Sequence, residues 1–421
     1  MQPKRIILLA ALIALVAKLY CAGMTTGTND VIFFHGFGKR INQNGLAHTY
    51  KTVSIFNHTP LVGGYAALLQ KLESDAQGTQ NTDVRDLRVL PLMLRLPGII
   101  ADFLAVLVLL RLRARTGSPP WWALGIFALS PVAFMVSGFH GNVDSVLALL
   151  LLVAACMAVE KQPALCGLAL GLACNVKVAP LLLAPVFLAW WWQRGKWLPF
   201  SLTAGVVTLV GWAPALLGAP KEFLGNVLGY QGYWGIWGLS YWLRASGAAV
   251  FEKVGFAELS GAQIIVMSVT KYLIIGSVLA VAWWRRKSDA PGLFTTLAWV
   301  WALFFVCATG IAPQYFVWLA PFLLVVTPRW FAAVTAAASV FMFVFYNVTS
   351  NVTTKEGKVT GGDPWAMPWE HPWNLSNSQN VHIAWWGPWQ TLPWVVLIGC
   401  LAWLTMRIWK ERVQNAGPSS A

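Results

Sequence analysis

The chain has 421 residues, of which 57% are hydrophobic and only 11% are charged. Soluble domains carry about 25% charged residues, so this composition excludes an ordinary soluble protein and favours one embedded in a membrane. The net charge of +14 would suit nucleic acid. The Lys and Arg residues, however, stand in small groups between apolar runs and form no basic stripe interleaved with aromatic residues. We therefore expect no nucleic-acid partner.

Apolar runs of about 20 residues mark candidate membrane spans, because about 30 Å of hydrocarbon requires that length of helix. We predict one integral membrane domain over residues 1–421, all-α, with about 12 transmembrane helices. Lys18 and Tyr20 occupy the place of small cleavage-site residues, so the first run is interpreted as an uncleaved span. The predicted spans cover residues 6–24, 93–110, 119–138, 144–159, 164–176, 178–192, 197–217, 262–284, 292–311, 314–327, 330–347 and 389–406. The fifth and sixth are short, which leaves a single Pro-broken hairpin as an alternative.

Basic residues in the short connections set the predicted orientation, because cytoplasmic loops carry an excess of Lys and Arg. Both termini are then expected in the cytoplasm. Most of the acidic residues fall on the opposite side, so we expect the chemistry there. The first outer loop, residues 25–92, contains amphipathic stretches that are expected to lie as interfacial helices. A second outer segment covers residues 218–261, and a third, residues 348–388, is rich in Trp and Pro.

Several polar residues stand where apolar runs meet the predicted outer face. Asp30 follows the first span directly, where its carboxylate would meet a lipid-borne headgroup, although Asp is also a favoured helix N-cap. Asn57 and His58 precede an apolar helical stretch and fit a turn and helix start. His140 and Asp144 flank the turn between the third and fourth spans. For Asp144, helix capping and a site role remain alternatives.

Other charged and polar residues have both structural and functional interpretations. Arg95 and Asp102 lie seven residues apart on one face of the second span, so each requires a partner, either the other residue or a neighbour. A structural ion pair and a site role are both open for them. Lys177 lies at an outer turn, where it would either meet an anionic phosphate or extend toward water. Gln314, with Tyr315, lies at another outer turn, and a substrate contact and a structural role are likewise both open for it.

One carboxylate with several cations suits transfer from a phosphate-activated lipid donor. A glycosidase needs two carboxylates, one of which protonates a poor leaving group. Phosphate is a good leaving group, so a transferase that expels it needs only a base for the acceptor proton. Cations then stabilise the departing phosphate.

The order of these motifs carries a family resemblance. An Asp beyond the first span is followed by the N-x-x-P turn at 57–60, RLP at 95–97, HGNVDS at 140–145, VKVAP at 176–180 and PQY at 313–315. Over roughly residues 25–330 the chain resembles the GT-C superfamily of integral membrane glycosyltransferases, which use polyprenyl- or dolichyl-phosphate sugars. The resemblance implies a GT-C-like fold, inverting transfer and Asp30 as the catalytic base. It also implies donor-phosphate or substrate contacts for the remaining candidates, which are Lys177, Arg95, His140, Asp144, Asn57, His58 and Gln314.

The chain departs from the pattern of this superfamily in two places. Thr28 stands where many members carry a second acid, so no metal ligand or cofactor is expected, although a divalent metal remains a less favoured alternative. Asn57 opens a turn that commonly begins with Asp, so the sugar is not assigned, and a mannose-like hexose is favoured by resemblance alone. The acceptor would be a hydroxyl of a glycan, a lipid or a protein.

The competing hypothesis is a polytopic transporter or lipid flippase. Such proteins usually show paired repeats and ionisable groups near mid-bilayer, whereas the ionisable residues here gather near one predicted face. The high Trp and Ala content favours a bacterial inner membrane with the site facing outward. For a eukaryotic host, the expectation becomes an ER membrane with a luminal site.

Overall fold

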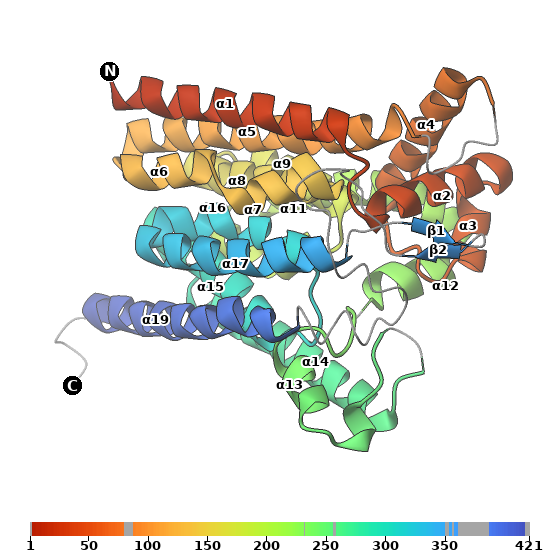
Figure 1. Ribbon diagram of the computed structural model, residues 1–421. Helices are drawn as coiled ribbons and strands as arrows, with labels where there is room; N and C mark the ends of the chain where they lie inside the picture. Colours follow the sequence, from red (N-terminus) through yellow and green to blue (C-terminus); the bar gives the residue numbers. More distant parts are fainter. Residues whose placement is uncertain are drawn as a thin grey trace.

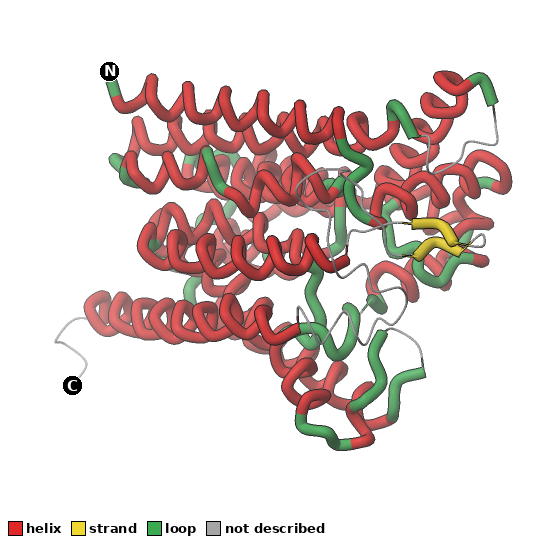
Figure 2. Tube along the Cα trace, in the orientation of Figure 1, coloured by secondary structure: helices red, strands yellow, loops and turns green. Residues whose placement is uncertain are grey.

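The structure of this chain is a computed structural model in which helices dominate (Figures 1 and 2). It describes residues 2–79, 87–230, 232–255, 258–349, 353–355, 358–360 and 387–416. Two short antiparallel strands, β1 (Thr353–Lys355) and β2 (Lys358–Thr360), are the exception to the predicted all-α class. Most of the Trp/Pro-rich segment predicted at 348–388 lies outside the described residues.

The long helices lie side by side and form a bundle (Figure 1). They are α1 (Pro3–Met24), α5 (Leu90–Thr116), α11 (Trp197–Gly218), α14 (Gly261–Trp284), α15 (Ala290–Cys307), α17 (Pro328–Thr349) and α19 (Thr391–Ala416). Within the described part of the chain, eight segments are long and apolar enough to cross a membrane, namely these seven helical regions and Trp121–His140. A polytopic membrane protein is therefore confirmed, whereas the predicted count of about 12 spans is not.

Shorter helices occupy the remaining predicted spans. Three of them are apolar segments of 10–17 residues, namely α8 (Asp144–Val159), α9 (Pro163–Val176) and the pair formed by the 3-10 turn η5 (Pro313–Tyr315) and α16 (Phe316–Val326). The predicted sixth span is a 3-10 turn, η2 (Ala179–Leu182), followed by α10 (Ala184–Gln193). Pro180 and Pro185 lie in the first turns of these two elements, where a missing backbone N–H costs nothing. The chain thus changes direction here instead of continuing one helix.

The third predicted span consists of three pieces. These are α6 (Trp121–Ala128), the single turn α7 (Pro131–Ala133) and η1 (Phe134–His140), which is a π-helical turn. Ser130 caps α7 by accepting a hydrogen bond from the main-chain N–H of Ala133 at 3.3 Å. Gly141 ends η1 with a φ of +84°, a backbone conformation that favours glycine.

Three helices of the first predicted outer loop pack across one end of the bundle, and residues 28–79 are called the cap below (Figure 1). They are α2 (Asn29–Asn44), α3 (Leu46–Thr52) and α4 (Pro60–Gln77). At Gly38, a Cβ atom would collide with the main-chain oxygen of Ala66, so α2 and α4 touch backbone to backbone. The shorter elements α12 (Pro220–Phe223), η3 (Leu224–Leu228), α13 (Gly238–Ala245), η4 (Ala249–Phe251) and η6 (Gly387–Gln390) belong to the remaining connections.

Glu73 fastens the cap to the bundle. This fully buried carboxylate accepts hydrogen bonds from the main-chain N–H groups of Arg88, Val89 and Leu90 at 2.7–2.8 Å, where α5 begins. Backbone N–H groups at a helix start have no hydrogen-bond acceptor within the helix. The Glu73 carboxylate supplies these acceptors. Burial raises the pKa of Glu73, but the three hydrogen bonds outweigh it and the pKa lies below its usual value.

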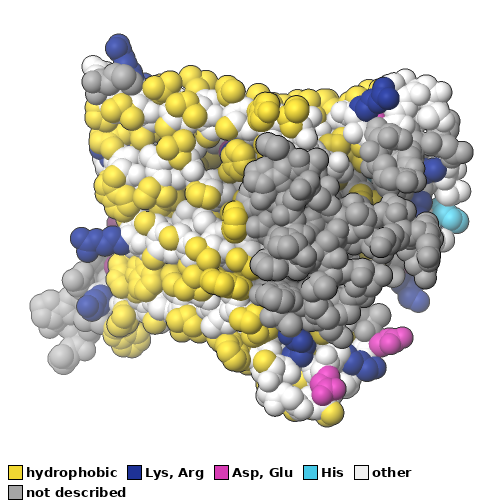
Figure 3. Space-filling view, viewed as in Figure 1, with side chains coloured by type: hydrophobic (Ala, Val, Ile, Leu, Met, Phe, Trp, Pro, Cys, Tyr) yellow, Lys and Arg dark blue, Asp and Glu magenta, His cyan; other side chains and the backbone are white. Residues whose placement is uncertain are grey.

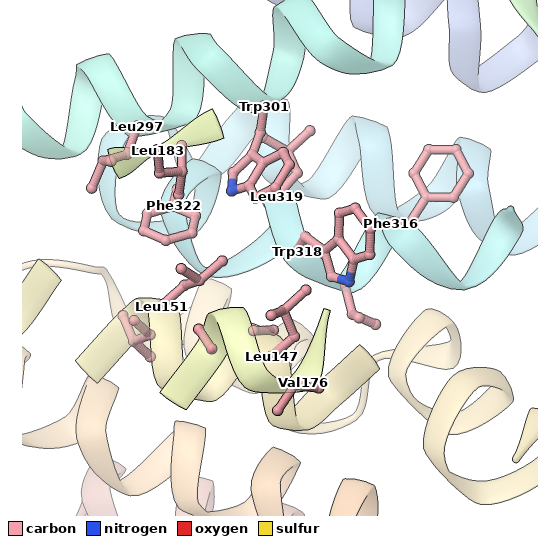
Figure 4. Packing of buried hydrophobic residues seen from close by; sticks show 14 of the residues in the cluster. Leu147, Leu151, Val176, Leu183, Leu297, Trp301, Phe316, Trp318, Leu319 and Phe322 are labelled. Atoms are coloured by element: carbon pink, nitrogen blue, oxygen red, sulfur yellow. The ribbon is translucent and has the colours of Figure 1, made fainter. Parts of the chain in front are cut away.

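Apolar side chains both fill the bundle and cover it. Between α8, α15 and α16, the side chains of Leu147, Leu151, Trp301, Trp318 and Phe322 pack together (Figure 4). Hydrophobic side chains also cover the outside of the parallel helices, whereas Lys and Arg gather toward the two ends (Figure 3). A large apolar exterior on helices of this length is the surface that lipid requires.

Candidate active site

Asp30 lies in the first turn of α2, directly beyond the end of α1. One carboxylate oxygen, Oδ2, accepts a hydrogen bond from the Asn142 amide at 2.8 Å and lies 3.0 Å from Nε2 of His140. Burial raises the pKa of Asp30, but His140, Asn142 and Lys177 together outweigh burial and lower the pKa to about 2. The carboxylate is therefore deprotonated at neutral pH, and its side chain remains 32% exposed.

Hydrogen bonds and ring stacking fix the position of His140, the last residue of η1. Thr28 donates its hydroxyl proton to the main-chain oxygen of His140 at 2.8 Å, and the same hydroxyl lies 2.9 Å from the ring Nδ1. The ring also stacks on Tyr346 of α17, with centroids 5.3 Å apart. Both ring nitrogens of His140 thus face oxygen atoms, Nδ1 the Thr28 hydroxyl and Nε2 the Asp30 carboxylate.

Lys177 and Asp144 form a second buried centre. The Lys177 ammonium donates to Oδ1 of Asp144 at 2.7 Å, and the indole N–H of Trp318 donates to the same oxygen at 2.9 Å. Asp144 makes no capping hydrogen bond to its own helix. The ammonium lies 4.7 Å from the ring centroid of Tyr315, and that ring stacks on Trp318 at 4.0 Å. Lys177, with its side chain 15% exposed, thus points into the protein rather than along the surface.

The turn that contains Asn57 and His58 docks beside Lys177. Thr59 donates its hydroxyl to the main-chain oxygen of Asn175, two residues before Lys177. The His58 ring packs against Phe34, Phe37 and Phe56 with centroids 4.9–5.8 Å apart. Burial, with Lys177 as a second cause, lowers the pKa of His58 to about 4 although Asp30 opposes this shift, so the ring is neutral at pH 7. Asn57 is half-buried at the same turn.

Arg95 and Asp102 do not pair with each other, so an ion pair between them is wrong. Arg95 is fully buried and donates to the main-chain oxygens of Ala22, at 3.1 Å, and Thr25, at 2.9 Å, and also to that of Thr26. These contacts shape the chain between α1 and Thr28, immediately before Asp30. Asp102 instead pairs with a residue of α1, described below.

The site also contains residues that the sequence analysis did not select as candidates. Asn142 belongs to the HGNVDS motif, and Trp318 follows the PQY motif, so both lie close to a recognised signal. Tyr230, in the loop after η3, has its pKa raised by burial and by the charge of Asp30, and it hydrogen bonds with Tyr315. Tyr346 lies near the end of an apolar run of the sequence, and no motif marks it as a site residue. Gln314 is buried next to Tyr315 in η5.

No cluster of three or more His, Cys, Asp or Glu side chains that would hold a metal ion occurs in the described part of the chain. The site consists of one partly exposed carboxylate, a histidine beside it, and a lysine lined by aromatic rings.

The sequence model named Glycosyltransferase family 87 matches residues 92–309, just over half of the chain. The chain belongs to glycosyltransferase family 87. The matched region includes four of the candidate residues, Arg95, His140, Asp144 and Lys177, whereas the cap with Asp30 precedes it and Gln314 follows it. A comparison with curated proteins gives no match. Membership in family 87 supports a membrane-bound glycosyltransferase, and it weighs against the transporter and flippase alternative.

Proposed function

We propose that this chain transfers a sugar, with a mannose-like hexose favoured, from a polyprenyl- or dolichyl-phosphate donor to an acceptor hydroxyl with inversion. The observation that carries the proposal is a partly exposed, deprotonated Asp30 at the same end of the bundle as the Lys177 ammonium. The charge of Lys177 is among the influences that lower the pKa of Asp30, after those of His140 and Asn142. A base and a cation in one site match the two needs of phosphate displacement.

The proposed reaction is a single displacement at the anomeric carbon. The acceptor oxygen forms the new bond to this carbon, and the bond from the carbon to the phosphate oxygen breaks. Its electron pair leaves with the lipid phosphate, whose added negative charge Lys177 stabilises. The hydroxyl proton passes to Asp30. With a pKa of about 2, Asp30 takes this proton only as the new bond forms and the hydroxyl becomes acidic.

The other residues of the candidate site fall into two groups in this proposal, positioning residues and substrate contacts. His140 and Asn142 hold the Asp30 carboxylate, and Asp144 holds Lys177 beside the Tyr315 ring. Arg95 uses its contacts to shape the chain before Asp30, which supports a positioning role better than contact with the donor phosphate. Asn57, His58 and Gln314 remain proposed substrate contacts.

The donor class is tested by offering the purified protein synthetic polyprenyl-phosphate hexoses and, in parallel, nucleotide hexoses, with glycan, lipid and peptide acceptors. We expect free polyprenyl phosphate and a product one hexose heavier, both detected by mass spectrometry. Heat-inactivated protein gives the background. Transfer from nucleotide hexoses with none from the lipid-linked donors would contradict the proposed donor class.

We further propose that the cap faces the non-cytoplasmic side, because the short basic connections lie at the opposite end. Lys51→Cys in the cap and Lys196→Cys in a basic connection place exposed thiols at the two ends. Five of the six native cysteines are buried and Cys307 is partly so, which keeps background labelling low. An impermeant maleimide should label position 51 in intact cells and position 196 only after permeabilisation. The reverse pattern would show the opposite orientation.

A further inference from the structure

An ion pair inside the bundle, with Lys18 buried and Asp102 partly buried, has no part in the proposed chemistry. Lys18 of α1 donates to Oδ2 of Asp102 on α5 at 2.5 Å. The same oxygen accepts a hydrogen bond from the Ser137 hydroxyl at 2.6 Å. A buried ion pair adds little net stability compared with well-packed apolar side chains, because both charges must be desolvated. Stability alone therefore does not account for these charges.

Ser137 stands in the middle of η1, a seven-residue π-helical turn. Such turns are rare, and they occur frequently at functional sites. This turn ends at His140, and Asn142 follows two residues later. These two residues supply the contacts of Oδ2 of Asp30 with the imidazole and the amide. A shift of η1 by one residue along its axis would therefore move both groups away from the carboxylate.

Two glycines bring the neighbouring helices close to η1 at this point. A Cβ atom on Gly138 would lie 3.1 Å from Cγ of Lys18, so α1 packs directly against the π-helical turn. A Cβ atom on Gly98 would lie 3.3 Å from Cβ of Ser137, so α5 does the same. Both distances are tighter than ordinary van der Waals contact. The close approach is what allows Asp102, paired with Lys18, to accept a hydrogen bond from the Ser137 hydroxyl in η1.

Packing on the remaining side of this region is incomplete. A cavity of about 30 Å³ adjoins the ion pair, and it exceeds the about 10–15 Å³ that a single water molecule requires. Its lining includes Asp102, Ser130, Ala133, Ser145, Phe316 and Thr335. Because α7, which leads directly into η1, borders this space, apolar packing is incomplete at the entry to the turn.

We propose that Lys18 and Asp102 are positioning residues that hold η1 in its π-helical register through Ser137, so that His140 and Asn142 meet Asp30. A carboxylate already engaged by an ammonium is a strong, directed acceptor for the hydroxyl. The consequence for catalysis rests on the proposed function of Asp30, whereas the register of η1 does not. The two are therefore tested by separate measurements.

The first test is Ser137→Ala, which removes the hydroxyl's contacts with Asp102 and with the main-chain oxygen of Ala133 at 2.9 Å and leaves the ion pair intact. The double variants described next separate these two contacts, because they change the Asp102 contact alone. Ser145→Ala is the matched control, because Ser145 is equally buried and its hydroxyl has no hydrogen-bond partner among the described residues. Hydrogen exchange over residues 134–142 should accelerate about tenfold in Ser137→Ala, and kcat should fall about tenfold while KM for the donor stays within about twofold. Ser145→Ala should change none of these quantities.

A pair of double variants tests the ion pair without leaving a buried charge unpaired. Lys18→Met with Asp102→Asn keeps an acceptor for Ser137 and should retain most of the rate. Lys18→Met with Asp102→Leu removes the acceptor and should match Ser137→Ala. Unchanged exchange over 134–142 in Ser137→Ala would overturn the proposal, and so would faster exchange with unchanged kcat. If Asp30→Asn proves active while exchange still accelerates in Ser137→Ala, the base assignment fails and the register role stands.

Discussion

Replacing Asp30 with Asn is expected to lower the transfer rate by about 10²–10⁴, the usual loss when a general base is removed. Asn retains the shape of the side chain and an oxygen that accepts from Asn142, but it takes no proton at neutral pH. The N-cap of α2 is unaffected, because the cap is the Thr28 hydroxyl. Donor binding should survive, since the base acts on the acceptor hydroxyl. The measurement is initial rate with a lipid-linked donor, with donor affinity determined separately.

The matched control for Asp30→Asn is Asp75→Asn, the same chemical change at an exposed position of the cap. It should have parental activity and stability. If Asp30→Asn remained within a few-fold of the parent, Asp30 would not be the base, and Asp144 would become the next candidate. Asp144 is completely buried and paired with Lys177, so it is a poorer base in this structure.

The membrane helices were largely predictable because hydrophobicity is a local property of the sequence. The second span is an example, predicted at 93–110 and found as Leu90–Thr116. An apolar window does not register the basic last turns at residues 111–116. The third span shows the opposite failure, since the run at 119–138 carries no charged residue and yet breaks before Pro131 and ends in a π-helical turn. That geometry depends on contacts with α1 and α5.

The sequence indicated several residues of the candidate site but not their pairings. Lys177 and Asp144 were noticeable because each is charged at the edge of an apolar run, and the structure brings them together although 33 positions separate them. Arg95 and Asp102 share a helix face, yet each contacts a different part of α1 and its exit. Helical spacing shows which residues share a face, whereas the neighbouring helix determines the partner.

Replacing Lys177 with Met is expected to weaken donor binding by about 10–100-fold, because a hydrogen bond to a charged group contributes about 1.5–3 kcal/mol. The same substitution leaves Asp144 buried without its counter-charge, and breaking such a pair costs about 3–5 kcal/mol of stability. The single variant Lys177→Met therefore lowers both donor affinity and stability.

The double variant Lys177→Met with Asp144→Asn separates them. Asn still accepts from the Trp318 indole, and no charge remains unpaired, so thermal stability should recover much of what Lys177→Met loses. Donor affinity should not recover, because the cation that would hold the phosphate is still missing. If the folded double variant bound the lipid-phosphate donor as tightly as the parent does, Lys177 would serve only to neutralise Asp144. The phosphate would then have to be held by other groups near Asp30, such as the His140 ring, whose Nε2 lies 3.0 Å from the carboxylate.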